Sequence, residues 1–164
     1  MSDEGLSHTD GSGRARMVDV SAKDESDRFA RASGAIRMAP TTLDAIRANA
    51  LKKGDVLAVA RIAGILAAKR TSETIPLCHP ISLTDTGVEF TLDDELPGVR
   101  VIAHARTRER TGVEMEALTA ATAALLTIYD MAKALDRGMT IIEVALLEKT
   151  GGASGDWKRE DAEP

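Results

Sequence analysis

A long segment of helical periodicity, residues 111–135, constrains the fold of this chain more than any other feature. At about 100° per residue, its large and small apolar side chains fall on one stripe: Leu118, Ala121, Leu125, Ile128, Ala132 and Leu135. Such a stripe is typical of a helix that buries one side in a core. The sequence Asp136-Arg137-Gly138 then predicts the end of the helix.

The same helix carries charged residues, which are costly in a core unless they are paired or used. Asp130 and Lys133 are three positions apart, so they share a face and flank the stripe. One interpretation is an exposed ion pair that contributes a few tenths of a kcal/mol. The other is a carboxylate and an ammonium group at the edge of a pocket, where they exchange protons.

Two glutamates lie at the start of this helix. Thr111-Gly112-Val113-Glu114 matches a capping box, which favours capping over catalysis for Glu114. Glu116 fits a solvated face and a binding role equally well. The two side chains are roughly 200° apart on a regular helix. Both can therefore line one site only if the first turn is distorted or a second subunit supplies one wall.

The segments around the helix predict an antiparallel sheet. Residues 81–92 and 99–108 resemble paired strands joined by an Asp-Asp-Glu-Leu-Pro-Gly turn, and residues 139–147 resemble a closing strand. This order predicts an α+β fold, a ferredoxin-like antiparallel sheet with helices packed on one face.

Shorter elements are expected in the first half of the domain. Residues 17–20, 33–38 and 55–60 are predicted to be strands. A helix capped by Thr41 or Thr42 should continue through Leu51 and stop at Gly54, and residues 61–70 should form a small helix.

One domain suits a chain of 164 residues. Residues 1–16 are polar and predict a disordered tail, residues 17–157 a single catalytic domain, and residues 158–164 a flexible C-terminal tail. Because only 2% of the residues are aromatic, the core must be built from Ala, Val, Leu, Ile and Met.

Charge and cysteine content narrow the function classes. A net charge of −5 argues against nucleic-acid binding. A single cysteine, Cys78, rules out an internal disulfide framework. No segment approaches the roughly 20 apolar residues of a membrane span, and the first residues lack the features of a signal peptide. We therefore expect a cytoplasmic protein that binds no membrane.

A proline-bracketed loop, residues 72–80, contains Cys78 and His79. Pro80 restricts His79 to extended backbone, so the loop could present the imidazole to a substrate as a donor or acceptor. A structural histidine bonded to backbone is the alternative. No second cysteine or spaced histidine pair supports a metal site. Lys53, Lys69 and Lys149 each fit ordinary surface lysines. The glycine turn of residues 151–155 could bind phosphate through its backbone N–H groups, although its spacing alone is a weak signal for such a site.

Several of these segments together resemble one family, the cyclic pyranopterin monophosphate synthases, also called molybdenum cofactor biosynthesis protein C. The most specific are Leu77-Cys78-His79-Pro80 and Thr111-Gly112-Val113-Glu114-Met115-Glu116-Ala117-Leu118. The resemblance also includes residues 17–20, 53–65, 129–131 and 149–155, in the family's order. It covers nearly the whole chain between the two tails.

The resemblance implies a lyase that converts 3′,8-cyclo-7,8-dihydroguanosine 5′-triphosphate to cyclic pyranopterin monophosphate and pyrophosphate. It implies a homohexamer, a trimer of dimers with the site at the dimer interface, and no cofactor beyond magnesium with the triphosphate. Asp130 and Lys133 would form the central acid–base pair. Other positions would bind substrate: Leu77, Cys78, His79, Glu114, Met115, Glu116, Lys53, Lys69, Lys149 and Arg28.

Two departures from the family pattern stand out. Ala153 occupies a position where the family usually has lysine, which weakens the glycine turn as a cationic clamp. Residues 106–110, Arg-Thr-Arg-Glu-Arg, are more charged than expected and could supply a phosphate contact or a solvated rim. A nucleotide-binding module without catalysis and an assembly protein with intersubunit salt bridges remain the alternatives to the enzyme.

Overall fold

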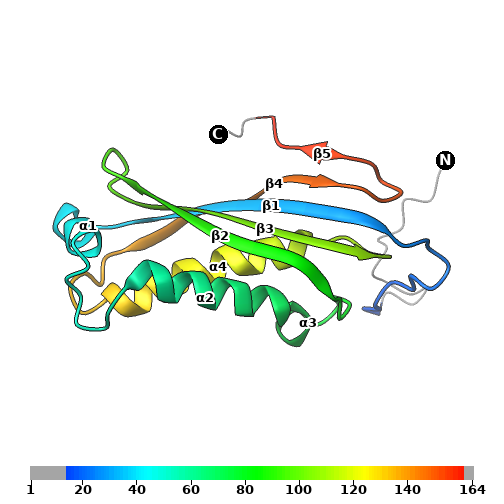
Figure 1. The fold of residues 1–164 in the computed structure, drawn as a ribbon, viewed down its shortest axis with the longest axis horizontal. Coiled ribbons are helices and arrows are strands. Elements are labelled where there is room, and N and C mark those ends of the chain that lie inside the picture. The colour runs from blue at the N-terminus through cyan, green and yellow to red at the C-terminus, as the bar shows by residue number, and fades with distance from the viewer. Residues whose placement is uncertain (1–13, 161–164) are drawn as a thin grey trace.

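The computed structural model describes residues 14–160 (Figure 1). Five antiparallel strands form one sheet in the order β2-β3-β1-β4-β5. Their bounds are Ser26–Arg37 for β1, Leu83–Asp93 for β2, Gly98–Glu109 for β3, Thr140–Thr150 for β4 and Trp157–Lys158 for β5. The helices are α1 (Pro40–Arg47), α2 (Val56–Lys69), α3 (Thr71–Thr74) and α4 (Glu114–Ala132).

Helices α2 and α4 lie side by side on one face of this sheet (Figure 1). The predicted α+β, ferredoxin-like arrangement is confirmed. Strand β1 is central, because it pairs with β3 over its whole length, from Ser26 opposite Glu109 to Arg37 opposite Gly98, and with β4 on its other side. The predicted hairpin of β2 and β3 is also confirmed.

Small side chains bring the two layers close together. The buried residues of the sheet and of α4 are mostly alanine and valine, among them Ala30, Ala32, Val99, Val101, Ala103, Ala117, Ala120, Ala121 and Ala124. Gly64 of α2 lies so close to α4 that an added methyl group would be 2.8 Å from the Ala120 carbonyl oxygen. The predicted aromatic-poor core is therefore a tightly packed layer of small residues.

The stripe predicted for α4 is largely confirmed. Ala121, Leu125, Ile128 and Ala132 are buried, and Leu118 packs against the core. Leu135 was wrongly included, because α4 ends at Ala132 and the Leu135 side chain is 60% exposed.

The prediction of a strand at residues 55–60 was wrong. Asp55 instead caps α2, accepting a hydrogen bond from the Ala58 backbone N–H at 2.9 Å, and the helix continues to Lys69. Helix α1 begins at Pro40 and ends at Arg47, well before Leu51. Residues 17–20 form no strand, although residues 33–38 do overlap β1.

The capping box at the start of α4 is absent. Val113, not Thr111, is the N-cap residue, and no side chain donates or accepts a capping hydrogen bond there.

The tails predicted for residues 1–16 and 158–164 fall mainly on residues 1–13 and 161–164, which lie outside the described residues. Lys158 belongs to β5. Among the described residues, every helix is too short or too polar to cross a lipid bilayer.

Candidate functional site

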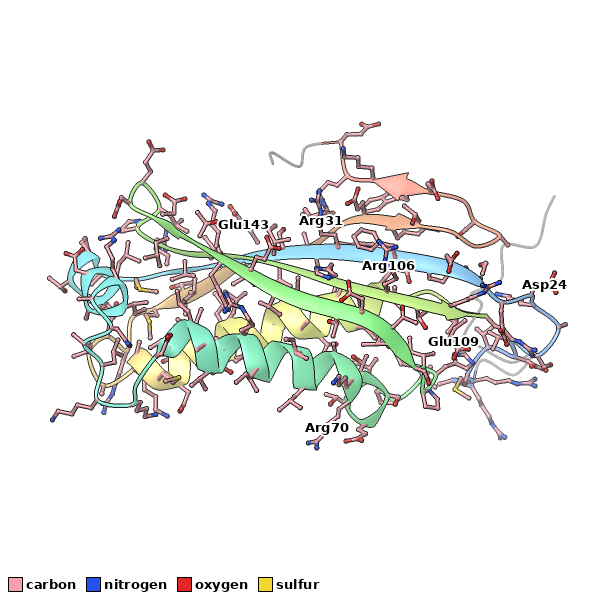
Figure 2. The ribbon with its side chains drawn as sticks, viewed as in Figure 1. Asp24, Arg31, Arg70, Arg106, Glu109 and Glu143 are labelled. Atoms are coloured by element: carbon pink, nitrogen blue, oxygen red, sulfur yellow. The ribbon has the colours of Figure 1, made fainter. Side chains whose placement is uncertain are left out.

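Two adjoining cavities lie at the end of the molecule where β1 and α4 begin. Their volumes are about 660 Å³ and about 320 Å³. Lys23, Thr111, Gly112 and Glu114 line both, so the cavities share one wall. Figure 2 shows Asp24 and Glu109 at this end of the molecule.

Three segments far apart in the sequence build the smaller cavity. It is lined by Val18, Val20, Lys23, Leu77, Cys78, His79, Thr111, Gly112, Glu114, Met115 and Glu116. Leu77, Cys78, His79, Glu114, Met115 and Glu116 are the substrate-contacting positions predicted from the sequence, apart from the basic residues. The His79 Nε2 atom lies 2.7 Å from the Val18 carbonyl oxygen, which ties the proline-bracketed loop to the N-terminal segment.

Glu116 is the most unusual group in this cavity. Its side chain is buried, with 4% of the residue exposed, so a solvated face is excluded. Burial, with a smaller contribution from the nearby charge of Glu114, raises the pKa of Glu116 to about 7. Burial also raises the pKa of the Cys78 thiol, to which the Glu116 charge adds. A carboxyl group that titrates near neutral pH can donate and accept protons.

Glu114 and Glu116 line the same cavity within one chain. Neither a distorted turn nor a second subunit is needed, because they occupy the first turn, where no earlier helical turn covers either side. The Glu114 carboxylate folds back over Gly112, and a methyl group at that glycine would overlap it. A side chain at residue 112 would therefore require this carboxylate to move.

The larger cavity is predominantly basic. Lys23, Arg28, Arg110 and Lys149 line it, together with the glycine turn of residues 151–154. The structure therefore brings the predicted residues Arg28 and Lys149 together. Charged groups of the opposite sign, Asp24 and Glu114, lie on the same lining.

The glycine turn fits closely around Arg28. Gly152 has φ 87°, a left-handed conformation, and a methyl group there would overlap the Arg28 guanidinium. Lys149 Nζ donates a hydrogen bond to the Ser154 hydroxyl. Ala153 lines the cavity without a charge, so the cations here come from neighbouring elements. Of the charged 106–110 stretch, Arg110 reaches the cavity, whereas Arg106 packs over the Phe29 ring.

Asp130, Lys133 and Lys53 form a separate cluster. The Asp130 carboxylate lies 2.7 Å from the Lys133 ammonium and 2.9 Å from the Lys53 ammonium. The hydrogen bonds from Lys133 and Lys53 lower the pKa of Asp130 to about 2. All three side chains are about half exposed, and none of them lines either cavity.

The cluster and the cavities lie at opposite ends of α4. Glu116 and Asp130 are fourteen positions apart on this helix, a distance of about 21 Å along its axis. Figure 1 shows the loop between α1 and α2, which carries Lys53, at the C-terminal end of α4, and the N-terminal segment at the other end. Lys69, the last residue of α2, is exposed and lines neither cavity.

Sequence reasoning missed several lining residues: Val18, Val20, Lys23 and Asp24. Lys23 looks like any surface lysine in the sequence. The signal that could have identified this segment is the conspicuous Met17-Val18-Asp19-Val20, which was interpreted as a strand. Among residues 14–160, no group of three or more His, Cys, Asp or Glu side chains could hold a metal ion.

Comparison with known proteins places these residues in a family. A family model described as the MoaC family matches residues 17–152. The chain belongs to the MoaC family. Its match includes the lining residues His79 and Glu116 and the separate carboxylate Asp130.

Curated relatives are similar to this chain over almost their whole length. Proteins from Brucella ovis (strain ATCC 25840 / 63/290 / NCTC 10512) and Brucella melitensis biotype 2 (strain ATCC 23457) are each 58% identical to this chain over 156 residues. The aligned region is 95% of this chain and 94% of each relative. Both relatives are named cyclic pyranopterin monophosphate synthase.

Proposed function

We propose that this chain is a cyclic pyranopterin monophosphate synthase. It converts 3′,8-cyclo-7,8-dihydroguanosine 5′-triphosphate to cyclic pyranopterin monophosphate and releases pyrophosphate, a step of molybdenum cofactor biosynthesis. The observation that carries this proposal is the 58% identity to relatives of that name over 95% of the chain. The charge distribution of the two cavities supports it independently.

The larger, basic cavity suits the triphosphate. Arg28, Lys149, Lys23 and Arg110 supply positive charge around one space. Release of pyrophosphate develops negative charge on the leaving group, which cations held in position stabilise. Magnesium would accompany the triphosphate rather than occupy a protein site. Lys69 is assigned to the phosphate or ribose side, outside both cavities.

The smaller cavity suits the purine-derived ring. Opening and reclosing such a ring needs several proton transfers, and each needs a positioned acid or base. Glu116, with a pKa of about 7, supplies a group that changes protonation near neutral pH, and the His79 imidazole lies on the same lining. Leu77, Cys78 and Met115 add apolar and polarisable surface for a flat ring.

Asp130 and Lys133 act as the central acid–base pair, with Lys53 beside them. Since they lie about 21 Å along α4 from Glu116, one chain cannot bring both groups to one substrate. A second copy must supply the other half. In the proposed assembly, the trimer of dimers that the family resemblance implies, the site lies at the dimer interface.

The outer face of the helical layer supports such an assembly. Large apolar side chains are exposed there at helical spacing, Val59, Ile62 and Leu66 on α2, with Leu126 on α4. An exposed apolar patch of this kind is typical of an interface. The proposal places the enzyme in the cytoplasm.

The direct test incubates the purified protein with the cyclic dihydroguanosine triphosphate. Pyrophosphate is assayed in parallel with the fluorescent pterin that forms when the product is oxidised. The proposal predicts both products in equal amounts. Substrate binding by calorimetry without either product would instead indicate a nucleotide-binding module.

A further inference from the structure

His79 has a defined hydrogen-bond partner at one ring nitrogen. Its Nε2 atom lies 2.7 Å from the Val18 carbonyl oxygen, 61 positions away in the sequence. A backbone carbonyl can only accept a hydrogen bond, so Nε2 must carry a hydrogen. In the neutral imidazole the other nitrogen, Nδ1, then has the free lone pair.

The segment that provides this carbonyl is held by its own hydrogen bonds. The Asp19 carboxylate accepts from the Ser21 backbone N–H at 2.9 Å, and the Lys23 N–H donates to the Val20 carbonyl at 3.0 Å. Arg110 donates to the Ser21 carbonyl at 2.9 Å, which ties the turn to the end of β3. The carbonyl of Val18 is thus presented by a folded turn.

The same segment forms part of the smaller cavity. Val18, Val20 and Lys23 line it together with His79 and Glu116. Since Nε2 of His79 is hydrogen-bonded to the Val18 carbonyl oxygen, Nδ1 is the polar ring atom that remains available to a bound molecule. Asp19 lies near enough to act electrostatically with His79, and Glu114, Glu116 and Lys23 are the other charged groups on this lining.

We propose that residues 17–23 are a positioning strap, in which the Val18 carbonyl fixes His79 in the Nε2–H tautomer and leaves Nδ1 as the hydrogen-bond acceptor for substrate. Val18 is a positioning residue, because it acts on the substrate only through His79. The substrate part of this inference rests on the proposed function, whereas the tautomer does not.

Nuclear magnetic resonance of the intact assembly tests the tautomer. The chain contains only His8, His79 and His104, so ¹⁵N-histidine labelling gives few signals, and a His79→Gln variant assigns one set. Spectra are recorded at mildly alkaline pH, where neutral rings dominate. We expect a protonated Nε2 on His79, protected from solvent exchange, and an unprotonated Nδ1. A protonated Nδ1, or a mixture of tautomers, would overturn the inference.

Two truncated chains form a matched pair. One begins at Met17 and keeps the strap, and the other begins with a methionine followed by Ser21 and lacks Val18. Protection of the Nε2 proton should persist in the first and be lost in the second. Protection that survives without Val18 would contradict the inference, as long as light scattering and thermal melting show an intact assembly.

Turnover by the same pair tests the consequence. The chain that begins at Met17 should retain the kcat of the full chain, whereas loss of the strap should lower kcat at least about tenfold, as expected for a misoriented or wrong-tautomer histidine. The His79→Gln variant keeps a donor for Val18 but lacks the Nδ1 acceptor, so it should also lose kcat. Full kcat without the strap would overturn the positioning role. If the full chain shows no turnover, the proposed function fails while the spectra still decide the tautomer.

Discussion

Lys53 and Asp130 are 77 positions apart in the sequence, yet the Lys53 ammonium lies 2.9 Å from the Asp130 carboxylate and 2.9 Å from the Asp130 carbonyl oxygen. Lys133 contacts the other carboxylate oxygen at 2.7 Å. The helix spacing alone would produce an ordinary surface pair. The loop between α1 and α2 adds a second cation, which makes Asp130 the centre of a cluster with a net positive charge.

Replacement of Asp130 by asparagine should abolish most of the turnover. With its pKa at about 2, the Asp130 carboxylate stays ionised at neutral pH, and asparagine removes that charge. We expect kcat to fall by about 10²- to 10⁴-fold, the usual contribution of a positioned acid or base. Because Asp130 is exposed, the melting temperature should change little. Asp44→Asn, another exposed aspartate in an i,i+3 pair, is the control. Unchanged kcat in Asp130→Asn would remove Asp130 from the mechanism.

Periodic segments of the sequence predicted the fold well, and short apolar runs did not. The α4 stripe and the two long strands of the hairpin each repeat one hydrophobic period over many residues. A long repeat separates helix from strand clearly, so these elements were predicted correctly. Residues 55–60 are too few to separate a strand from a helix by period. The start of α2 is decided instead by the Asp55 cap and by alanine-rich packing against α4.

The candidate site was predictable in its residues and not in its arrangement. The motifs at Leu77-Cys78-His79 and at Met115-Glu116 indeed meet in one cavity. Burial of Glu116 could not be predicted, because its neighbour Cys78 is distant in sequence. The α4 helix was predicted to bear both Glu116 and Asp130, and in the structure these residues lie near opposite ends of the helix.

Glu116 should make the protein less stable as pH rises. Its pKa is 4.5 in an unfolded chain and about 7 in the folded protein, so the folded state binds more protons between these values and stability falls as pH rises through them. The upper limit of this loss is about 3 kcal/mol. Urea unfolding at fixed protein concentration, from about pH 5 to about pH 8, measures it.

The Glu116→Gln variant cannot ionise at this position, so its free energy of unfolding should decline less over that range. Glu73→Gln, at an exposed position of α3, serves as the control and should follow the unmodified chain. Parallel pH dependence in the unmodified chain and Glu116→Gln would mean that Glu116 is ionised in the folded protein.

Gly152→Ala should impair substrate binding. The added methyl group would displace the Arg28 guanidinium from the larger cavity, so KM should rise about tenfold or more, the loss of one charge-assisted contact. Gly155→Ala is the matched control variant. Gly155 also has a positive φ, 68°, but an added methyl group there would meet open space. Both variants should lose about 1 kcal/mol of stability from backbone strain. Equal KM values for the two would argue that Arg28 does not contact substrate.

Ile62→Glu should dissociate the assembly. Ile62 is 60% exposed in the single chain and lies between Val59 and Leu66, the other exposed apolar residues of α2. An unpaired charge buried at an interface there is costly. Light scattering should show a smaller species, and turnover should fall with it. Ile62→Met keeps an apolar side chain and should leave the mass unchanged. An Ile62→Glu protein of unchanged mass would show that this face is not an interface.

The central claim is that the Asp130 cluster of one subunit completes the cavity of another. Two variants, Asp130→Asn and His79→Gln, are each purified, shown to be inactive, and then mixed by unfolding and refolding together. In a symmetric dimer, random pairing leaves about one quarter of the sites with both intact halves, so about a quarter of the full turnover should return. No recovery, with hybrid assemblies demonstrated by mass spectrometry, would contradict a shared site.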